Sequence, residues 1–456
     1  MIREINNKRD ASKDSIFGFV YGINLNLLIL HLVYFLLLFW VYSHYVVVIY
    51  AHAGFADTLN INKAIISCSV IAVSFLILHN NGMPSFFFLN IIIALIITPS
   101  LVITSGSDLP FSFLLVTWAA YIIIVLVVRF VRIPRIKIKQ IQDVVLLRAF
   151  ALLGVLFIAS IFALGGGQYF NINFARVYDF REVAAKNVPD IFSYLSNNFS
   201  QAIIPLCLVL AVIKRRWSLM LVFMFSGFML FGLFSHKSAL LLPLMTLFFY
   251  WIAKHKNALK LALLSFILIV VFGGVDWHIK QSGVEGISGW FGFLFVERAI
   301  ITPSWLNWGY YDFFTVNPHY YWAHSKISLG LVDSNYDIRI DHLIGREFSG
   351  NEAIGANTGW IGSGMGQAGY FGVALYSVLF GLLLSLVDAY AKKLGRSLVL
   401  AIFFIPVVVI ATSIDLTTVL LTNGLLLTLL IVVLLKKPLV PNSFQHYKEK
   451  VNWEYK

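Results

Sequence analysis

The side chains that could do chemistry are concentrated in one stretch of the chain, residues 276–364. Its basic residues are Lys280, Arg298, Lys326, Arg339 and Arg346, and its acidic residues are Asp276, Glu285, Glu297, Asp312, Asp333, Asp337, Asp341, Glu347 and Glu352. Trp, Tyr and Phe lie between them, in runs such as WLNWGYYDFF and HYYW. Because the guanidinium fork binds phosphate bidentately and keeps its charge beside apolar surface, the pattern predicts an anion site suited to a pyrophosphate at a membrane face. A solvated surface of ion pairs is the competing interpretation for most of these charges.

Three histidines of the same stretch, His319, His324 and His342, lie near carboxylates in the sequence. A zinc site needs a spacing such as His-x3-His on one helical face with a third ligand, and the spacing of His319 and His324 does not supply it. An imidazole or a carboxylate can instead accept a hydroxyl proton near neutral pH. The stretch therefore favours a general base over a metal site, but spacing alone does not select one of its histidines or acids.

Gly364, Gly366 and Gly369 match the dinucleotide-binding fingerprint by letter. That fingerprint has meaning only after a strand in a βαβ unit, whereas here it enters the apolar run GQAGYFGVALYSVLFGLLLSLV. Small residues let helices pack closely, so we interpret the three glycines as structural, allowing close packing and a bent entry to a spanning helix.

Lys237 belongs to a very short polar hairpin, Ser235–Ser238, between two apolar runs. A Lys between apolar helices is costly unless it faces water or an anion. Anion binding and simple solvation are both open for this residue.

The composition indicates what must position these residues. The chain has 456 residues, 59% of them hydrophobic and 12% charged, and a mean hydropathy of +0.83. A soluble domain carries about twice that charge, roughly 25%. The composition therefore excludes a soluble enzyme, a disordered protein, a coiled coil and a disulfide-rich secreted module, and it predicts a protein solvated by lipid. The two cysteines, Cys68 and Cys207, lie in apolar runs and are too few for a zinc or iron–sulfur site.

Twelve apolar runs are candidates for membrane-spanning helices, which need about 20 predominantly apolar residues. They lie near residues 20–42, 63–80, 85–104, 111–131, 144–164, 193–213, 218–235, 238–253, 259–275, 365–388, 397–414 and 419–435. Backbone polar groups find no water in lipid, and the runs do not alternate polar with apolar residues, so helix is the expected state. The sequence predicts an all-α polytopic membrane protein of about 12 spans, forming a single membrane domain over residues 1–456.

The placement of charge supports this count. When sides alternate from a cytoplasmic start, about two thirds of the 34 Lys and Arg residues fall in inside segments, as the positive-inside rule expects. Both termini are therefore predicted to be cytoplasmic, and the net charge of +12 needs no nucleic-acid partner to explain it. The inside segment 79–85 carries no Lys or Arg and is the exception.

Two outside segments are much longer than the other connections, near residues 165–192 and 276–364. Long loops in a chain of otherwise short turns are usually functional. In the first, Glu182 and Lys186 are spaced i,i+4 beside apolar residues, which predicts an amphipathic helix on the membrane surface. The second lies between the predicted ninth and tenth spans and is expected to cover the active site.

The span count, the moderate outside loop between the fifth and sixth spans and the large loop late in the chain resemble Wzy-type O-antigen and capsule polymerases. The local sequences ERAIITPSWLNWGYYDFF, HKSALLL and NTGWIGSGMGQAGYFGVALYSVLFGLLL carry this resemblance. Some members of the family have an Arg, ten residues and then a Gly in each long outside loop. Arg298 with Gly309 and Arg339 with Gly350 fit that spacing, but the first loop does not (Arg176 leads to Asn187, and Arg181 to Phe192).

The resemblance implies a GT-C-like, metal-independent membrane glycosyltransferase of the bacterial inner membrane that uses no cofactor. It would move a growing glycan from undecaprenyl pyrophosphate onto the next lipid-linked repeat unit at the periplasmic face. Cations held at the departing pyrophosphate would stabilise the transition state. The residues implied for that role are Arg298, Arg339 and Arg346, followed by Arg176, Arg181 and Lys237.

Asp341 or His342, beside Arg339, would deprotonate the acceptor hydroxyl, with Arg298 as a further catalytic group. The partners implied are undecaprenyl-pyrophosphate-linked glycans and the lipid bilayer, together with a chain-length regulator and a flippase.

Two other functions stay open on the sequence. A lipid-linked oligosaccharide flippase or another transporter would share the span count, but it would place polar residues in mid-span and use short outside loops. Most runs here are cleanly apolar, and one outside segment covers residues 276–364. An O-antigen ligase would share the layout and the chemistry and differ in using lipid A core as its acceptor.

Overall fold

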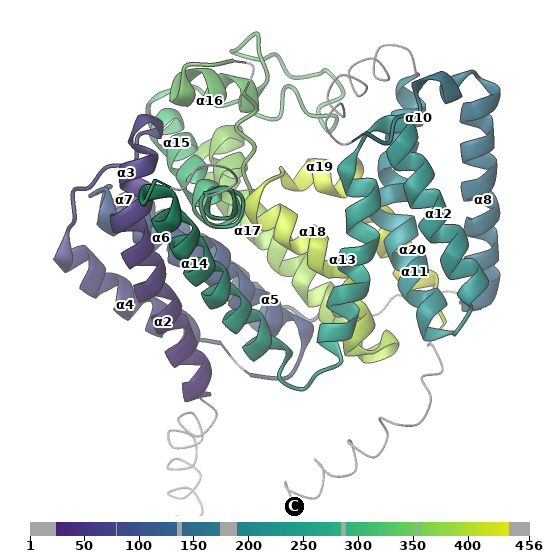
Figure 1. The fold of residues 1–456 in the computed structure, drawn as a ribbon, viewed down its shortest axis with the longest axis horizontal. Coiled ribbons are helices and arrows are strands. Elements are labelled where there is room, and N and C mark those ends of the chain that lie inside the picture. The colour runs from purple at the N-terminus through teal and green to yellow at the C-terminus, as the bar shows by residue number, and fades with distance from the viewer. Residues whose placement is uncertain are drawn as a thin grey trace, which may run out of the picture. The chain divides into compact units, whose positions relative to one another are not determined.

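The computed structural model of the protein describes residues 24–78, 80–134, 139–173, 189–283, 289–352 and 354–436 (Figure 1). Within these ranges the chain is helical and has no β-strand. Eight helices in the described part of the chain are long and apolar enough to cross a membrane. The prediction of an all-helical, multi-pass membrane protein is therefore confirmed.

These eight helices coincide with predicted runs. They are Leu25–Ile49 (α2, Leu25–Val41; η1, Tyr42–Val46; α3, Val47–Ile49), Pro84–Gly106 (α5, Pro84–Ile92; η3, Ile93–Ile97; α6, Thr98–Gly106), α7 (Phe111–Phe130), α8 (Asp143–Ala163), Ile191–Ile213 (within α10, Asp190–Asn198; η6, Phe199–Ile203; α11, Ile204–Ile213), α12 (Trp217–Phe234), α14 (Ala258–Gln281) and α17 (Trp360–Leu394).

The remaining four runs form shorter apolar helices: α4 (Ile61–Leu76), α13 (Lys237–Ala253), α18 (Arg396–Thr412) and α20 (Leu425–Leu434). The last predicted run is interrupted, because a separate helix α19 (Leu416–Leu421) ends before Gly424, which has φ +77°. The count of twelve spans, the cytoplasmic termini and the sidedness of the loops stay predictions.

The described residues divide into two compact units. The first comprises the described parts of Met1–Ile133, Lys256–Asp388 and Val407–Thr417. Its centre is the helix α5–η3–α6, in which every residue is buried. A helix that is apolar all round needs such an environment. Around it, α2 packs against α4, α6 and α14, and α6 also contacts α7 and α15 (Thr302–Val316).

The outside segment predicted over 276–364 is largely helical where it is described. It begins inside α14 and contains the π-helix η7 (Gly292–Ile301), α15 and α16 (Ile340–Ser349). The Asp276 carboxylate accepts hydrogen bonds from the backbone N–H groups of Gly289 (2.8 Å) and Gly292 (2.9 Å), so it fixes the start of η7. A Cβ at Gly292 would lie 2.4 Å from the buried ring of Trp277, so only glycine allows η7 to approach α14 this closely.

Helix α17 is bent near its start. Ala368 has φ −155° and ψ 33°, and Gly369 has φ +59° and ψ −141°, so neither residue is helical. On either side of the bend, a Cβ at Gly372 would lie 2.1 Å from the carbonyl oxygen of Gly364. The interpretation of these glycines as a device for close packing and a bent entry is confirmed.

The second unit comprises the described parts of Pro134–His255, Ala389–Pro406 and Thr418–Lys456. In it, α11 packs against α12 and α13, and α12 packs against α8. The Lys214 ammonium lies 2.7 Å from the Asp143 carboxylate, which joins the end of α11 to the start of α8. The amphipathic helix predicted around Glu182 and Lys186 falls outside the described residues. That residues 1–456 form one membrane domain also stays a prediction.

Candidate functional site

The first unit places three of the predicted site residues, Asp341, His342 and Arg346, on α16, a short helix that the sequence did not predict, and Arg339 directly precedes this helix. Asp341 lies in its first turn, where a negative charge complements the helix dipole, and Gly350 ends the helix with φ +67°. Leu343 and Ile344 are buried apolar side chains of this helix. A Cβ at Gly345 would lie 1.9 Å from the carbonyl oxygen of Ile354, so the returning chain crosses the helix at a glycine.

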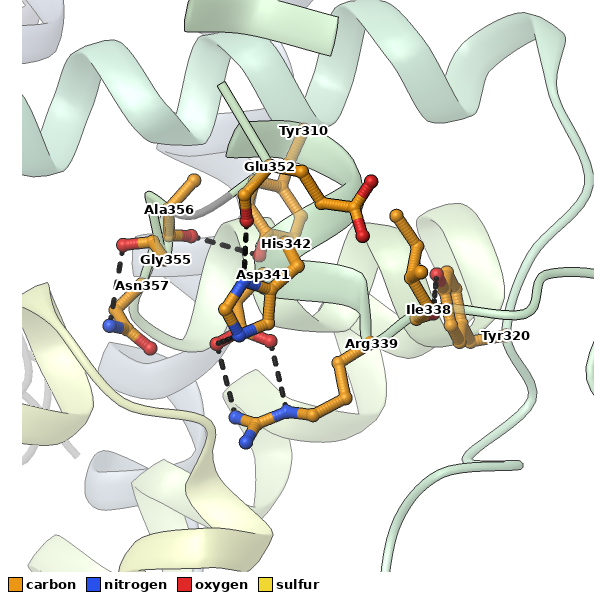
Figure 2. Close-up of polar contacts among 10 residues, drawn as sticks. All are labelled: Tyr310, Tyr320, Ile338, Arg339, Asp341, His342, Glu352, Gly355, Ala356 and Asn357. Atoms are coloured by element: carbon orange, nitrogen blue, oxygen red, sulfur yellow. Dashed lines mark hydrogen bonds and ion pairs between the residues drawn. The ribbon is translucent and has the colours of Figure 1, made fainter. Parts of the chain in front are cut away.

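Arg339 and Asp341 form a bidentate ion pair at the start of α16 (Figure 2). The Nε–Oδ1 distance is 3.2 Å and the Nη2–Oδ2 distance is 3.0 Å. The Arg339 side chain is 70% exposed, whereas that of Asp341 is only 11% exposed. Both oxygens of the Asp341 carboxylate are therefore engaged by the Arg339 guanidinium.

The hydrogen bonding of the His342 imidazole suits it to act as a general base. Its Nδ1 atom lies 2.7 Å from the backbone carbonyl oxygen of Glu352. Because a carbonyl only accepts, Nδ1 must donate, and the neutral imidazole then carries its free lone pair on Nε2. Nε2 lies 4.0 Å from Asp341 Oδ2, and the side chain is 36% exposed, so it is open to a substrate. Of the two bases predicted, the geometry favours His342.

Arg346 follows His342 by one helical turn and is paired with surface carboxylates. Its Nε atom lies 3.1 Å from Glu347 Oε1, and its Nη1 atom lies 3.8 Å from Glu352 Oε2. These partners are about half exposed. An exposed ion pair contributes only about 0–1 kcal/mol, so an anionic ligand can replace these carboxylates at little cost.

Aromatic side chains pack beside α16. The Tyr320 hydroxyl donates to the carbonyl oxygen of Ile338 (2.7 Å), and its ring stacks on Tyr336 with centroids 4.8 Å apart. The Tyr310 hydroxyl donates to the carbonyl oxygen of Ala356 (3.0 Å) (Figure 2). Burial, with a further contribution from the Asp341 charge, raises the pKa of Tyr310 well above its usual range. Both tyrosines therefore act as neutral hydrogen-bond donors that fix the chain on either side of α16.

The other predicted site residues are not on α16. Arg298 is exposed on η7 of the first unit. Lys237 is exposed at the start of α13 in the second unit. Arg176 and Arg181 fall outside the described residues, so their proposed role stays a prediction.

Trp305 connects η7 to the neighbourhood of α16. It follows η7 in the chain, donates from Nε1 to the carbonyl oxygen of Ala53 (3.1 Å) and lies 5.4 Å from the ring of Phe348 on α16. Its ring also packs on Phe55, with centroids 4.6 Å apart. The segment after α3 and the last turn of α16 are thus held against the same indole.

Glu297 is a residue whose importance the sequence did not reveal. It was one of nine acids in its stretch, and only the structure places it half-buried on a π-helix, a conformation common at functional sites. Its Oε1 atom accepts a hydrogen bond from Thr302 Oγ1 (2.7 Å). Burial raises the pKa of the Glu297 carboxyl, and the Thr302 hydrogen bond and the charges of Arg298 and His52 partly oppose that shift. The adjacent Glu–Arg pair is the only sequence signal that points to it.

Replacing Glu297 by glutamine is expected to raise thermal stability at neutral pH. A carboxyl whose pKa is raised by folding stabilises the protein while it is protonated, and this contribution is lost as the pH rises through the folded-state pKa. Glutamine keeps an oxygen for Thr302 without the buried charge. Melting curves in detergent should differ by on the order of a few degrees at about pH 7 and converge near about pH 4.

Asp337→Asn, which removes an exposed carboxylate, is the matched control and should leave both curves unchanged. A Glu297→Gln protein that melts earlier at neutral pH would contradict the prediction.

Among the described residues, no three His, Cys, Asp or Glu side chains are grouped as a metal site. Comparisons with protein-family models, with curated proteins and with solved structures found no match to this chain.

Proposed function

We propose that this protein is a polymerase that joins undecaprenyl-pyrophosphate-linked oligosaccharide repeat units into O-antigen or capsular polysaccharide at the periplasmic membrane face. The observation that carries the proposal is the arrangement on α16. His342 has its Nδ1 committed to the Glu352 carbonyl and its Nε2 available, next to a carboxylate held by Arg339 and one turn from Arg346. A base beside guanidinium groups suits the transfer of a sugar from a pyrophosphate leaving group.

In the proposed reaction, the hydroxyl oxygen of the acceptor sugar attacks C1 of the donor sugar. His342 Nε2 accepts the hydroxyl proton as the new C1–O bond forms. The bond from C1 to the pyrophosphate oxygen breaks, and its electron pair leaves with undecaprenyl pyrophosphate. The proton on the imidazole then returns to solvent, so the base is regenerated.

The arginines have different roles in this proposal. Arg339 uses Nε and Nη2 on Asp341, so it orients the start of α16 beside the base. Arg346 forms ion pairs with the exposed carboxylates of Glu347 and Glu352, so it can turn to the departing pyrophosphate. Arg298, exposed on η7, supplies a further cation. Preorganised positive charge at the leaving group lowers the barrier because negative charge develops there in the transition state.

The decisive experiment is deletion of the gene in its native host, followed by electrophoresis of the surface glycan. The proposal predicts glycan with a single repeat unit and no long-chain ladder. If no repeat units at all reach the surface, the protein is a flippase. If core appears without any repeat unit while lipid-linked polymer accumulates, it is a ligase.

Arg298→Ala is expected to abolish the ladder in the same assay, with a polymerisation rate lower by about 10²- to 10³-fold, because one leaving-group cation is lost. Membrane levels of the variant are measured by immunoblotting. Arg132→Ala removes an exposed arginine elsewhere in the chain and should leave the ladder intact. An unaltered ladder in the Arg298 variant would remove this residue from the site.

A further inference from the structure

A short segment between α15 and α16 displays large apolar side chains. Leu329 and Leu331 are 83% and 85% exposed, and Ile327 is 51% exposed. Lys326 borders them and is also exposed. Leucines this accessible in a folded segment indicate a contact that the described residues of the chain do not provide.

The segment holds these side chains in a defined turn. The Ser328 hydroxyl donates to the carbonyl oxygens of Ala323 (3.1 Å) and Ser325 (2.8 Å), and Leu331 N–H donates to the carbonyl oxygen of Ser328 (2.8 Å). Leu329 has φ +51°, a conformation uncommon for a residue other than glycine. The turn therefore presents its leucines through specific bonds and at some cost to the backbone.

The chain just before this turn is fastened to the bend of the spanning helix α17. Backbone N–H groups of Tyr320 and Tyr321 donate to the carbonyl oxygens of Gly366 (3.0 Å) and Gln367 (2.8 Å), which directly precede the bend at Ala368 and Gly369. Trp322 donates from its backbone N–H to Gln367 Oε1, at 2.8 Å. Its indole Nε1 donates to the Tyr376 hydroxyl, also at 2.8 Å.

The surface of α17 next to this attachment is apolar and exposed as well. Tyr370 and Phe371, directly after the bend, are 56% and 69% exposed. In a spanning helix, such side chains face lipid. The chain that leads into the apolar turn is thus attached beside a lipid-facing surface, and Tyr321, Trp322 and Lys326 are the residue types that favour the headgroup level of a bilayer.

We infer that the turn Ile327–Val332 inserts into the bilayer beside α17 and is a membrane anchor for the segment that carries α16. Its partner is the acyl-chain and glycerol region of the membrane. The inference does not depend on the proposed activity. Together with that activity, it explains how a site on a short polar helix stays at the depth where the pyrophosphate of a lipid-linked substrate lies.

Spin labelling of the full-length chain tests the anchor. In a Cys68→Ser, Cys207→Ala background, single cysteines replace Leu329 or Leu331, carry a nitroxide and are reconstituted in liposomes of phosphatidylethanolamine and phosphatidylglycerol. Asp337→Cys, an exposed position nearer α16, is the matched control. At 329 and 331 the label should become several-fold more accessible to oxygen and several-fold less accessible to a water-soluble nickel chelate than at 337.

Equal nickel accessibility at all three positions would place the turn in water and overturn the inference. Low accessibility to both reagents would also overturn it, because the turn would then be covered by protein, such as a second copy. Circular dichroism of each labelled protein verifies that it is folded. Because the readout is depth, a failed polymerase assay leaves this result unaffected, and a failed depth assay leaves the polymerase proposal standing.

Discussion

His342→Ala is expected to lower the rate of chain polymerisation by about 10²- to 10⁴-fold, the usual contribution of a positioned general base. The substitution removes the Nε2 lone pair that the bond between Nδ1 and the Glu352 carbonyl makes available. It does not touch the ion pair between Arg339 and Asp341. The rate is measured with purified lipid-linked repeat units and the full-length protein in proteoliposomes.

His324→Ala is the control for this variant. His324 is also exposed in the segment between α15 and α16, with its ring edge-on to Tyr320 at 5.4 Å, but it has no place in the proposed reaction. Its removal should change the rate less than about twofold, since surface substitutions usually cost within 0.5 kcal/mol. If the two histidine variants behave alike, His342 is not the base.

Gly369→Ala is expected to destabilise the protein by about 1–3 kcal/mol, and by more if the bend has to open. Its φ of +59° with ψ of −141° is accessible to glycine and strained for any side chain. The added Cβ would also lie 2.8 Å from His319 Nε2. Thermal unfolding in detergent measures the loss, and protease sensitivity of residues 318–332 reports whether the segment leaves the bend.

Gly330→Ala separates strain from crowding. Gly330 has φ +75°, but no atom lies within 4 Å of the position its Cβ would take. This variant should lose only the backbone contribution and should keep its resistance to protease. Equal losses for the two variants would show that contact with His319 adds nothing, and an unchanged melting curve for Gly369→Ala would contradict the strain argument.

The spanning helices follow the sequence closely. The run predicted near 111–131 is the helix Phe111–Phe130, and the run near 144–164 is Asp143–Ala163. Hydropathy is a local property, and lipid leaves the backbone no other hydrogen-bonded state, so local composition suffices. The run predicted near 419–435 is not one continuous helix, and the reason is also local, because Gly424 with φ +77° interrupts it.

Helix α16 illustrates what composition could not predict. Its ten residues, IDHLIGREFS, mix charged and apolar types and resemble the polar segments around them. The chain that returns just after the helix packs on it: Ala356 N–H donates to the Asp341 carbonyl oxygen at 2.9 Å, and the carbonyl of Ile354 packs on Gly345. Short helices depend on such tertiary packing more than on propensity.

The sequence by itself predicted that lipid surrounds this protein, where its apolar helices lie and in which stretch arginines and histidines meet aromatic residues. Each of these follows from which residues are present and how they are spaced. Only the tertiary structure decided that Asp341 is engaged by Arg339 while His342 Nδ1 bonds the Glu352 carbonyl, and that Tyr320 and Tyr321 bind the bend of α17. The reason is physical: the role of a titratable group depends on which partners fill its hydrogen bonds, and the composition and spacing of a segment do not say which nearby or distant groups folding brings to it.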